Sequence, residues 1–369
     1  MLVSIFAARE NPMNHHLLRV TLIFITSWMV AVSDVPAQKP GPAAKIMILE
    51  TTLDRPHWGM RPTLSGKEIE ELRQSAPEVE FFVVPVKDAV SRIGEADAMI
   101  GETSPAIIRA GRKLRWVQAI SAGVEDYVCP EMIDQEITLT NLKIIQAPEV
   151  ADHAMALLLS LTRCLTTYIP ARGDRNWEIR HDIEPIELRG KAALIIGLGG
   201  IGTQVAERAH AFGMRVLAVD PRDAQITGSV DRLGRLEQLY EFIPLADVII
   251  SCVPHTPVTQ GMLGPREFGL MKKGVYFVNI SRGKVVQTEA LVAALREGRL
   301  AGAGLDVLDP EPLPANHPLW SFKNVVITPH IATKSDAMPE RRMELFKDNV
   351  RRFVRGLPLR NVVNKRAGY

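Results

Sequence analysis

The stretch that most constrains this chain runs from Lys191 to Asp220, where an apolar segment leads into a glycine-rich turn. Ala192 to Ile196 is uniformly apolar, as expected for a strand buried on both faces of a parallel sheet. The next six residues have the pattern G-x-G-x-x-G, and apolar residues then recur at helical spacing as far as Phe212. A second apolar strand, Met214 to Val219, completes the unit. A lone G-x-G-x-x-G is weak evidence, but in this context it predicts a dinucleotide-binding site.

The residues of this turn each have a predicted purpose. Glycines permit a tight turn, close approach of the backbone to a pyrophosphate, and close packing of helix on strand; these are Gly197, Gly199, Gly200 and Gly202. Asp220 follows the second strand, where a carboxylate would bond the two hydroxyls of an adenosine ribose. A carboxylate there repels a 2′-phosphate, so NAD is the favoured cofactor. Arg222 could weaken that repulsion, so NADP is not excluded.

Length and composition limit the function classes. With 369 residues, the chain is long enough for two domains that each bury a core. A hydrophobic content of 46% and a charged content of 23% are typical of a globular protein. The net charge of +2 gives no electrostatic reason to expect nucleic acid as a partner. The three cysteines lie in or beside apolar runs without metal-ligand spacing, which favours buried free thiols and predicts no metal site: Cys129, Cys164 and Cys252.

Residues 1–43 differ from the rest and are left out of the fold prediction. Val20 to Val32 is an uncharged apolar run that follows Arg19. Val35-Pro36-Ala37 after it resembles the cleavage site of an export signal. The run is short for a membrane span, so the prediction is an export signal or membrane tether, with a leader from a misplaced start codon as the alternative. A nicotinamide cofactor instead implies the cytoplasm, and the sequence does not resolve this conflict.

From residue 44 onward, apolar strands alternate with helical segments, which is typical of an α/β fold. The first set of predicted strands covers 46–49, 79–84, 98–100, 114–120 and 138–144, with a helix over 66–74. The second set covers 192–196, 214–219, 248–253, 275–280, 303–307 and 325–328. The prediction is therefore two doubly wound parallel sheets, of which the second is a Rossmann dinucleotide-binding domain.

Two long helices set the predicted domain boundaries. One begins near Pro148 and is apolar on several sides, so it is expected between domains or at a subunit contact. The other, Pro339 to Val354, follows the completed second sheet and is expected to return to the first domain. The predicted substrate domain is therefore 44–147 with 332–369, and the NAD-binding domain, 148–331, is inserted in it.

Three groups of polar residues follow strands of the second sheet, at the edge where open α/β sheets bind ligands. Arg282 can hold a carboxylate with a bidentate fork. His330 can exchange a proton near neutral pH, and the carboxylate of Glu311 could orient its ring. Each residue taken singly has an alternative explanation: Arg282 could form a surface ion pair, His330 could be a structural histidine of a turn, and Glu311 could be solvated. Together, beside a dinucleotide site, these residues predict hydride chemistry at an oxygen-bearing carbon.

The second half of the chain also carries a specific set of motifs: GLGGIG, LADVIISCVPHTPVTQGML, VNISRGKVV, GLDVLDPEPLP, NHPLW and ITPHIA. On these stretches the chain resembles the D-isomer-specific 2-hydroxyacid dehydrogenases, which include phosphoglycerate dehydrogenases and glyoxylate/hydroxypyruvate reductases, from about Lys45 to Asn364. The resemblance implies reversible reduction of a 2-oxo acid to a D-2-hydroxy acid with NADH. It also implies a homodimer and a catalytic triad of Arg282, Glu311 and His330.

Further site residues come from the same resemblance. The substrate carboxylate is expected at Arg282 and at the backbone N–H groups of Ala122 and Gly123. Additional cofactor contacts are implied at Ile201, Val253, Pro254, His255, Thr259, Ile280, Ser281, Asp306 and His330. Two stretches depart from the family pattern without touching the triad: Val286-Gln287-Thr288-Glu289, and Ala151-Asp152-His153, where alanine, glutamate and histidine are more usual.

Two alternatives stay open. Formate dehydrogenases share the architecture, but the resemblance gives them glutamine in place of Glu311. The C-terminal-binding corepressors use the same fold as NAD(H)-sensing interaction proteins. The sequence does not identify the 2-hydroxy acid or say whether it is phosphorylated. Side chains of the loop Thr52 to Arg61 could set that preference, with solvated positions as the alternative: Arg55, His57, Trp58 and Arg61.

Overall fold

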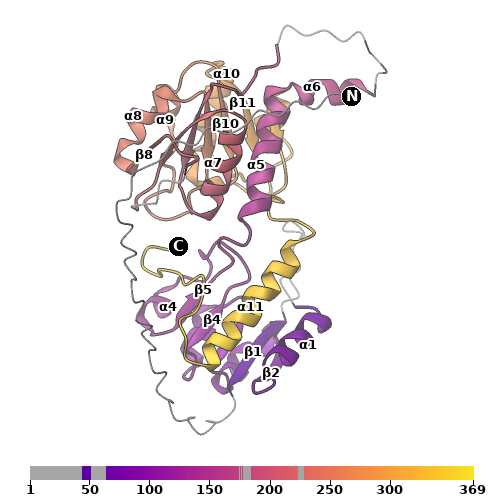
Figure 1. Cartoon of the computed structure of the whole chain (residues 1–369), viewed down its shortest axis with the longest axis vertical. Coiled ribbons are helices and arrows are strands. Elements are labelled where there is room, and N and C mark those ends of the chain that lie inside the picture. Colours follow the sequence, from indigo (N-terminus) through magenta and orange to yellow (C-terminus); the bar gives the residue numbers. More distant parts are fainter. Residues whose placement is uncertain (1–43, 51–63, 174, 176, 178–183, 223–227) are drawn as a thin grey trace, which may run out of the picture. The chain divides into compact units, whose positions relative to one another are not determined.

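The computed structural model describes residues 44–50, 64–173, 175, 177, 184–222 and 228–369 (Figure 1). Two sheets organise these residues, one of five strands and one of seven. Every strand pair in both sheets is parallel. The predicted architecture of two doubly wound parallel sheets is therefore confirmed. The predicted leader, 1–43, and the loop Thr52 to Arg61 lie outside the described residues.

The first sheet has the strand order β2-β1-β3-β4-β5. Its strands are β1 (Lys45–Glu50), β2 (Glu80–Pro85), β3 (Ala98–Ile100), β4 (Trp116–Gln118) and β5 (Thr138–Thr140). Its helices are α1 (Gly66–Ser75), α2 (Ala89–Arg92), α3 (Pro105–Ala110) and α4 (Pro130–Asp134). Successive residues of a strand point to opposite faces, so Met47 and Leu49 enter one core whereas Ile46 and Ile48 enter another. Both faces of this sheet are buried.

The second sheet has the order β12-β11-β10-β9-β6-β7-β8. Its strands are β6 (Ala192–Ile196), β7 (Arg215–Val219), β8 (Arg232–Gly234), β9 (Val248–Ser251), β10 (Val275–Asn279), β11 (Leu300–Leu305) and β12 (Val325–Ile327). Its helices are α7 (Gly200–Ala211), α8 (Leu239–Phe242), α9 (Pro265–Leu270) and α10 (Thr288–Arg296). All five residues of β6 are fully buried at the centre of the sheet. The edge strand β8 was not predicted, because only one of its three residues is a large apolar residue.

The apolar helix expected near Pro148 is α5 (Ala147–Thr162), and the short α6 (Leu165–Ala171) follows it. Proline occupies the first turn of α5, as expected. Leu157, Leu158 and Leu161 are buried in one core with residues of β10 and α7. The apolar surface of α5 is therefore covered by the second sheet of the same chain. The burial of α5 within the chain gives no support to the alternative prediction that this helix forms a subunit contact.

The final helix, α11 (Met338–Val354), packs on the first sheet (Figure 1). Met343, Phe346 and Val350 share a core with Ile46 and Ile48 of β1. Two ion pairs connect α11 to α1: Arg342 with Glu68, and Lys347 with Glu71 at 2.6 Å. The chain therefore contributes to the first sheet's core both before and after it forms the second sheet.

Candidate active site

The glycine-rich turn joins β6 to α7, and two of its glycines shape it. Gly197 has φ +92°, a conformation that favours glycine. A Cβ on Gly202 would lie 1.9 Å from the carbonyl oxygen of Gly197. Gly199 precedes the first residue of α7, so the unpaired N–H groups of this helix begin directly at the turn. A helix N-terminus that begins at consecutive glycines fits a pyrophosphate group.

Asp220 follows β7, and donors of the protein itself engage both of its carboxylate oxygens. Oδ1 accepts hydrogen bonds from N and Nε of Arg222 at 3.0 and 2.9 Å. Oδ2 accepts from N of Leu198 at 2.8 Å and from Nη2 of Arg222 at 3.1 Å. Burial alone would raise the pKa of Asp220, but these hydrogen bonds outweigh it and lower that pKa. Asp220 exposes 3% of its side chain and Arg222 exposes 51%, so the guanidinium is the more accessible group.

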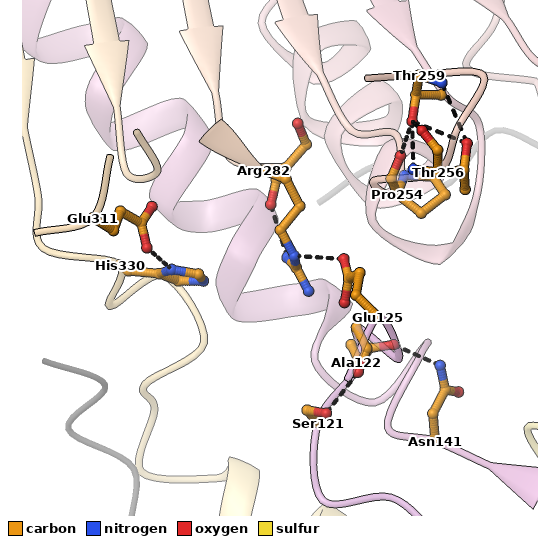
Figure 2. Close-up of polar contacts among 12 residues, drawn as sticks. Ser121, Ala122, Glu125, Asn141, Pro254, Thr256, Thr259, Arg282, Glu311 and His330 are labelled. Carbon is orange, nitrogen blue, oxygen red and sulfur yellow. Dashed lines mark hydrogen bonds and ion pairs between the residues drawn. The ribbon is translucent and has the colours of Figure 1, made fainter. Parts of the chain in front are cut away.

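The loop after β9 carries four of the expected cofactor-contact residues. Cγ1 of Val253 would lie 2.9 Å from a Cβ on Gly197, so this loop packs directly on the glycine-rich turn. Thr259 Oγ1 donates a hydrogen bond to the carbonyl oxygen of Pro254 at 2.6 Å, which closes the loop (Figure 2). Nε2 of His255 is buried and has no hydrogen-bond partner within the part of the chain that the structure describes.

Buried polar groups support the chain between β10 and Arg282. The Ser281 hydroxyl donates to Oδ1 of Asn279 at 2.7 Å and lies 2.9 Å from the hydroxyl oxygen of Ser251. The Asn279 amide donates to the carbonyl oxygen of Arg282 at 3.1 Å. Ile280 is 5% exposed and belongs to the core beneath the sheet. The backbone that carries Arg282 is therefore fixed by its own neighbours.

Arg282 reaches the turn that follows β4 (Figure 2). Its Nε donates a hydrogen bond to Oε1 of Glu125 at 2.9 Å, and its Nη1 donates to the carbonyl oxygen of Ser281 at 2.8 Å. Nη2 lies against Gly123, because a Cβ on Gly123 would be 1.7 Å from this nitrogen. The guanidinium is thus oriented by one acidic partner and one carbonyl, with its remaining amino group directed at Gly123.

The turn beneath this guanidinium holds its own carbonyl groups. The Ser121 hydroxyl donates to the carbonyl oxygen of Gly123 at 2.6 Å, and the Asn141 amide donates to that of Ala122 at 2.6 Å (Figure 2). In the described ranges, the N–H groups of Ala122 and Gly123 donate to no acceptor of the protein. Two such N–H groups beside a guanidinium suit a bound carboxylate.

His330 and Glu311 point toward one another (Figure 2). Nδ1 of His330 lies 2.9 Å from Oε2 of Glu311, and 14% and 30% of their side chains are exposed. The other carboxylate oxygen of Glu311 accepts a hydrogen bond from N of Leu308 at 2.7 Å. The carboxylate is therefore fixed by its own loop while it holds one nitrogen of the imidazole.

The backbone at His330 has φ +52°, which is uncommon for a residue with a side chain. Asp306, which directly follows β11, holds this turn. Its carboxylate accepts hydrogen bonds from N of Ile331 at 3.0 Å, from N of Ala332 at 3.1 Å and from Oγ1 of Thr328 at 2.6 Å. Its carbonyl oxygen accepts from N of His330 at 2.9 Å. Burial would raise the pKa of Asp306, but its hydrogen bonds prevail and lower that pKa.

Comparison with known proteins identifies the family. Residues 155–332 match the family model described as D-isomer specific 2-hydroxyacid dehydrogenase, NAD binding domain. The chain is 32% identical to the glyoxylate reductase of Korarchaeum cryptofilum over 85% of its own length and 95% of that protein. The chain belongs to the D-isomer-specific 2-hydroxyacid dehydrogenase family. As in this family, it is an oxidoreductase that uses a nicotinamide cofactor, NAD or NADP.

Two further relatives show how far the likeness extends. The D-3-phosphoglycerate dehydrogenase of Archaeoglobus fulgidus is 33% identical over 81% of this chain, but the match spans only 54% of that protein. A D-isomer-specific 2-hydroxyacid dehydrogenase from Xanthobacter autotrophicus Py2 was solved with NADPH and MES. It is 25% identical to this chain with a TM-score of 0.76, and the match covers 89% of this chain and 100% of the Xanthobacter protein. The likeness to this dehydrogenase therefore includes both sheets.

The sequence did not reveal every residue that shapes the site of this dehydrogenase. Glu125 was missed, although an acidic residue directly after the expected carboxylate-binding turn is a natural partner for an arginine. His153 was noted only as part of a motif, yet its Nε2 lies 2.8 Å from the Thr328 hydroxyl oxygen. Asp306 was expected to contact the cofactor, which stays a prediction; the hydrogen bonds from Thr328, Ile331 and Ala332 to its carboxylate were not predicted.

Two general features complete the description of the dehydrogenase. Among the described residues, no group of His, Cys, Asp or Glu side chains has the arrangement of a metal site. No single helix in these ranges is long and apolar enough to cross a membrane; α5 and α6, bent by 74°, meet the length and composition criteria only as a pair.

Proposed function

We propose that this dehydrogenase reduces a 2-oxo acid to the D-2-hydroxy acid, with Arg282 binding the substrate carboxylate and His330 and Glu311 acting as the acid/base pair. The observation that carries the proposal is the 2.9 Å contact between Nδ1 of His330 and Oε2 of Glu311. A carboxylate that holds one imidazole nitrogen fixes the tautomer and stabilises the imidazolium form. The other nitrogen, Nε2, is then the one that transfers a proton.

The proposed clamp consists of Arg282 and the turn at Ala122 and Gly123. Nη2 of Arg282 lies beside Gly123, so a substrate carboxylate there can accept from the guanidinium and from backbone N–H groups together. A charge-assisted contact of this kind contributes about 1.5–3 kcal/mol. This clamp fixes one end of the substrate, which leaves the keto oxygen to accept the proton from His330.

The residues of the glycine-rich turn fit the nicotinamide cofactor of this family. Gly197 and Gly202 permit the tight turn, and α7 begins at Gly200, so the unpaired N–H groups of this helix are available to a pyrophosphate. When bound, the reduced cofactor supplies a hydride to the keto carbon. The remaining cofactor contacts that we propose are Gly199, Ile201, Asp220, Val253, Pro254, His255, Thr259, Ile280, Ser281, Asp306 and His330.

We also propose the domain division, the assembly and the location that the sequence predicted. Residues 44–147 with 332–369 would form the substrate domain, and 148–331 the cofactor domain, which is supported by the packing of α11 on β1. A homodimer rests on the family resemblance, since the apolar residues of α5 are buried within the chain. The cofactor favours the cytoplasm, whereas an export signal or tether in 1–43 would contradict it.

The test is oxidation of NADH and NADPH by the purified protein with a panel of 2-oxo acids: glyoxylate, hydroxypyruvate, pyruvate and phosphohydroxypyruvate. We expect turnover with at least one of them. In the Arg282→Ala variant kcat/KM should fall on the order of 10–100-fold, since a charged contact is lost. Cofactor binding without turnover of any 2-oxo acid would refute the reductase and favour the NAD(H)-sensing interaction protein. Unchanged kinetics of Arg282→Ala would remove this residue from the clamp.

A further inference from the structure

His153 lies in α5 and contacts two residues that hold the turn of His330. Its Nε2 is 2.8 Å from the hydroxyl oxygen of Thr328 and 3.4 Å from Oδ1 of Asp306. The Thr328 hydroxyl donates its proton to Asp306 at 2.6 Å, so it must accept from His153. The proton of His153 therefore lies on Nε2 and is directed at the Thr328–Asp306 pair.

The contact of His153 with Thr328 fixes the carboxylate of Asp306, which holds the turn of His330. This carboxylate accepts hydrogen bonds from the N–H groups of Ile331 and Ala332, the two residues that directly follow His330. His330 itself has φ +52°, a conformation that costs on the order of 1 kcal/mol and needs support from its surroundings. Any rotation of the Asp306 carboxylate would release both N–H groups and so move the ring of His330.

Two residues that precede His153 anchor α5 to other helices. Asp152 accepts a hydrogen bond from Nε of Arg208 in α7 at 2.6 Å. One turn earlier, Glu149 accepts from Nη2 of Arg341 in α11 at 2.5 Å. His153 is therefore presented from a helix that is tied to both neighbouring helices, and only 20% of its side chain is exposed.

We propose that His153 is a positioning residue of this dehydrogenase: through Thr328 and Asp306 it holds the turn that places the imidazole of His330 for proton transfer. This inference rests on the proposed function, in which His330 supplies the proton. His153 itself touches neither substrate nor cofactor in this role. Its loss should impair the proton-transfer step while substrate binding by Arg282 stays intact.

The experiment compares His153→Phe, which removes the donor, with His153→Gln, whose amide can still donate to Thr328. The exposed His210 in α7, changed to Phe, serves as the matched control. For His153→Phe we expect kcat to fall on the order of 10–100-fold with an unchanged KM for the 2-oxo acid. The solvent isotope effect on kcat should increase, because proton transfer becomes slower. His153→Gln should recover most of the rate, and His210→Phe should match the wild type.

Amide hydrogen exchange gives a readout that does not depend on turnover. In His153→Phe the peptide that covers 328–333 should exchange faster, whereas peptides from β6 and β10 should not change. A kcat of His153→Phe within twofold of the wild type, or unchanged exchange in 328–333, would overturn the role of His153. If the wild type turns over no 2-oxo acid, the proposed function fails, and the exchange result still decides whether His153 holds the turn.

Discussion

Glu125 accepts a hydrogen bond from Nε of Arg282 at 2.9 Å, although these residues are far apart in the sequence and belong to loops of different sheets. Each side chain is 29% exposed, so water screens the pair only in part. The same guanidinium is the proposed partner of the substrate carboxylate. Because Glu125 already neutralises Arg282, a bound 2-oxo acid has to share this cation with Glu125.

We therefore predict that Glu125→Gln lowers the KM for the 2-oxo acid about two- to fivefold. Glutamine still accepts from Nε of Arg282, so the guanidinium keeps its orientation, but it no longer competes with the substrate charge. A change of this size corresponds to about 0.5–1 kcal/mol, as measured for partly exposed ion pairs. Steady-state kinetics with saturating NADH provide the measurement. A higher KM in this variant would show that the charge of Glu125 supports substrate binding instead.

Gly123→Ala should weaken substrate binding without unfolding the protein. The new Cβ would lie 1.7 Å from Nη2 of Arg282 and 2.5 Å from Oε2 of Glu125, so both flexible side chains must move away. We expect KM for the 2-oxo acid to rise about tenfold or more, with Tm changed by only a few degrees. Gly66→Ala is the matched control, because its Cβ would meet nothing within 4 Å. An unchanged KM would place the substrate carboxylate elsewhere.

Arg222→Ala should shift the cofactor preference toward NADH. In the wild type the half-exposed guanidinium of Arg222 covers the buried carboxylate of Asp220. Its removal leaves an uncompensated negative charge where the 2′-phosphate of NADPH would lie. We expect the ratio of kcat/KM for NADH to that for NADPH to rise about tenfold, or 1.4 kcal/mol. Arg215→Ala, at the opposite end of β7, should leave the ratio unchanged, and equal ratios in both variants would contradict the prediction.

Glu311→Gln should lower kcat for reduction of the 2-oxo acid. The carboxylate lies 2.9 Å from Nδ1 of His330, where it orients the ring and fixes the nitrogen that carries the proton. Glutamine carries no charge, and its amide can present either an oxygen or an NH2 group to Nδ1, so it holds the ring less well. We expect kcat to fall on the order of 10–100-fold with an unchanged KM for the 2-oxo acid. Exposed Glu297→Gln is the control, and a kcat within twofold of the wild type would remove Glu311 from this role.

The sequence predicted best the strands that are apolar along their whole length, because such strands are buried on both faces of the sheet. All five residues of β6 are buried, and its observed bounds are those of the apolar run. The strand expected over 114–120 is shorter, since only Trp116 to Gln118 pair with both neighbours. The strand expected from Ala303 instead begins at Leu300. Ends of strands depend on partners in the sheet, which a single sequence does not specify.

The site was less accessible to sequence reasoning than the fold. Arg282 and Asp306 could be predicted as site residues because each follows a buried strand. The carboxyl ends of parallel strands lie at one edge of the sheet, where ligands bind. The partner of Arg282 could not be predicted, because Glu125 lies in a loop whose path depends on tertiary packing. Arg222 was noted beside Asp220, but the hydrogen bonds from its guanidinium to the Asp220 carboxylate were not predicted. A carboxylate assigned to a ligand from its position, such as Asp220, can therefore be engaged by the protein itself.

Asp306→Asn should lower the free energy of unfolding at neutral pH. At acidic pH the variant and the wild type should be equally stable. The pKa of Asp306 is lower in the folded protein than in the unfolded chain, so the folded state favours the ionised form. Its stabilising contribution is therefore complete above the unfolded value of about 3.9 and is lost as the pH falls through the lower folded value. Ile331 and Ala332 donate to different oxygens of Asp306, and asparagine replaces one of these oxygens by an NH2 group that cannot accept. We therefore expect the free energy of unfolding to fall by about 1–3 kcal/mol at pH 7.

Urea denaturation of the wild type and of Asp306→Asn at pH 7 and at successively lower pH measures this difference. The gap in the free energy of unfolding should narrow below about pH 4, because the wild-type carboxyl then becomes protonated as well. Asp134→Asn, at an exposed position in α4, is the control and should show no gap at either pH. A gap that stays constant down to pH 3 would mean that the shape of the side chain, rather than its charge, holds the turn of His330.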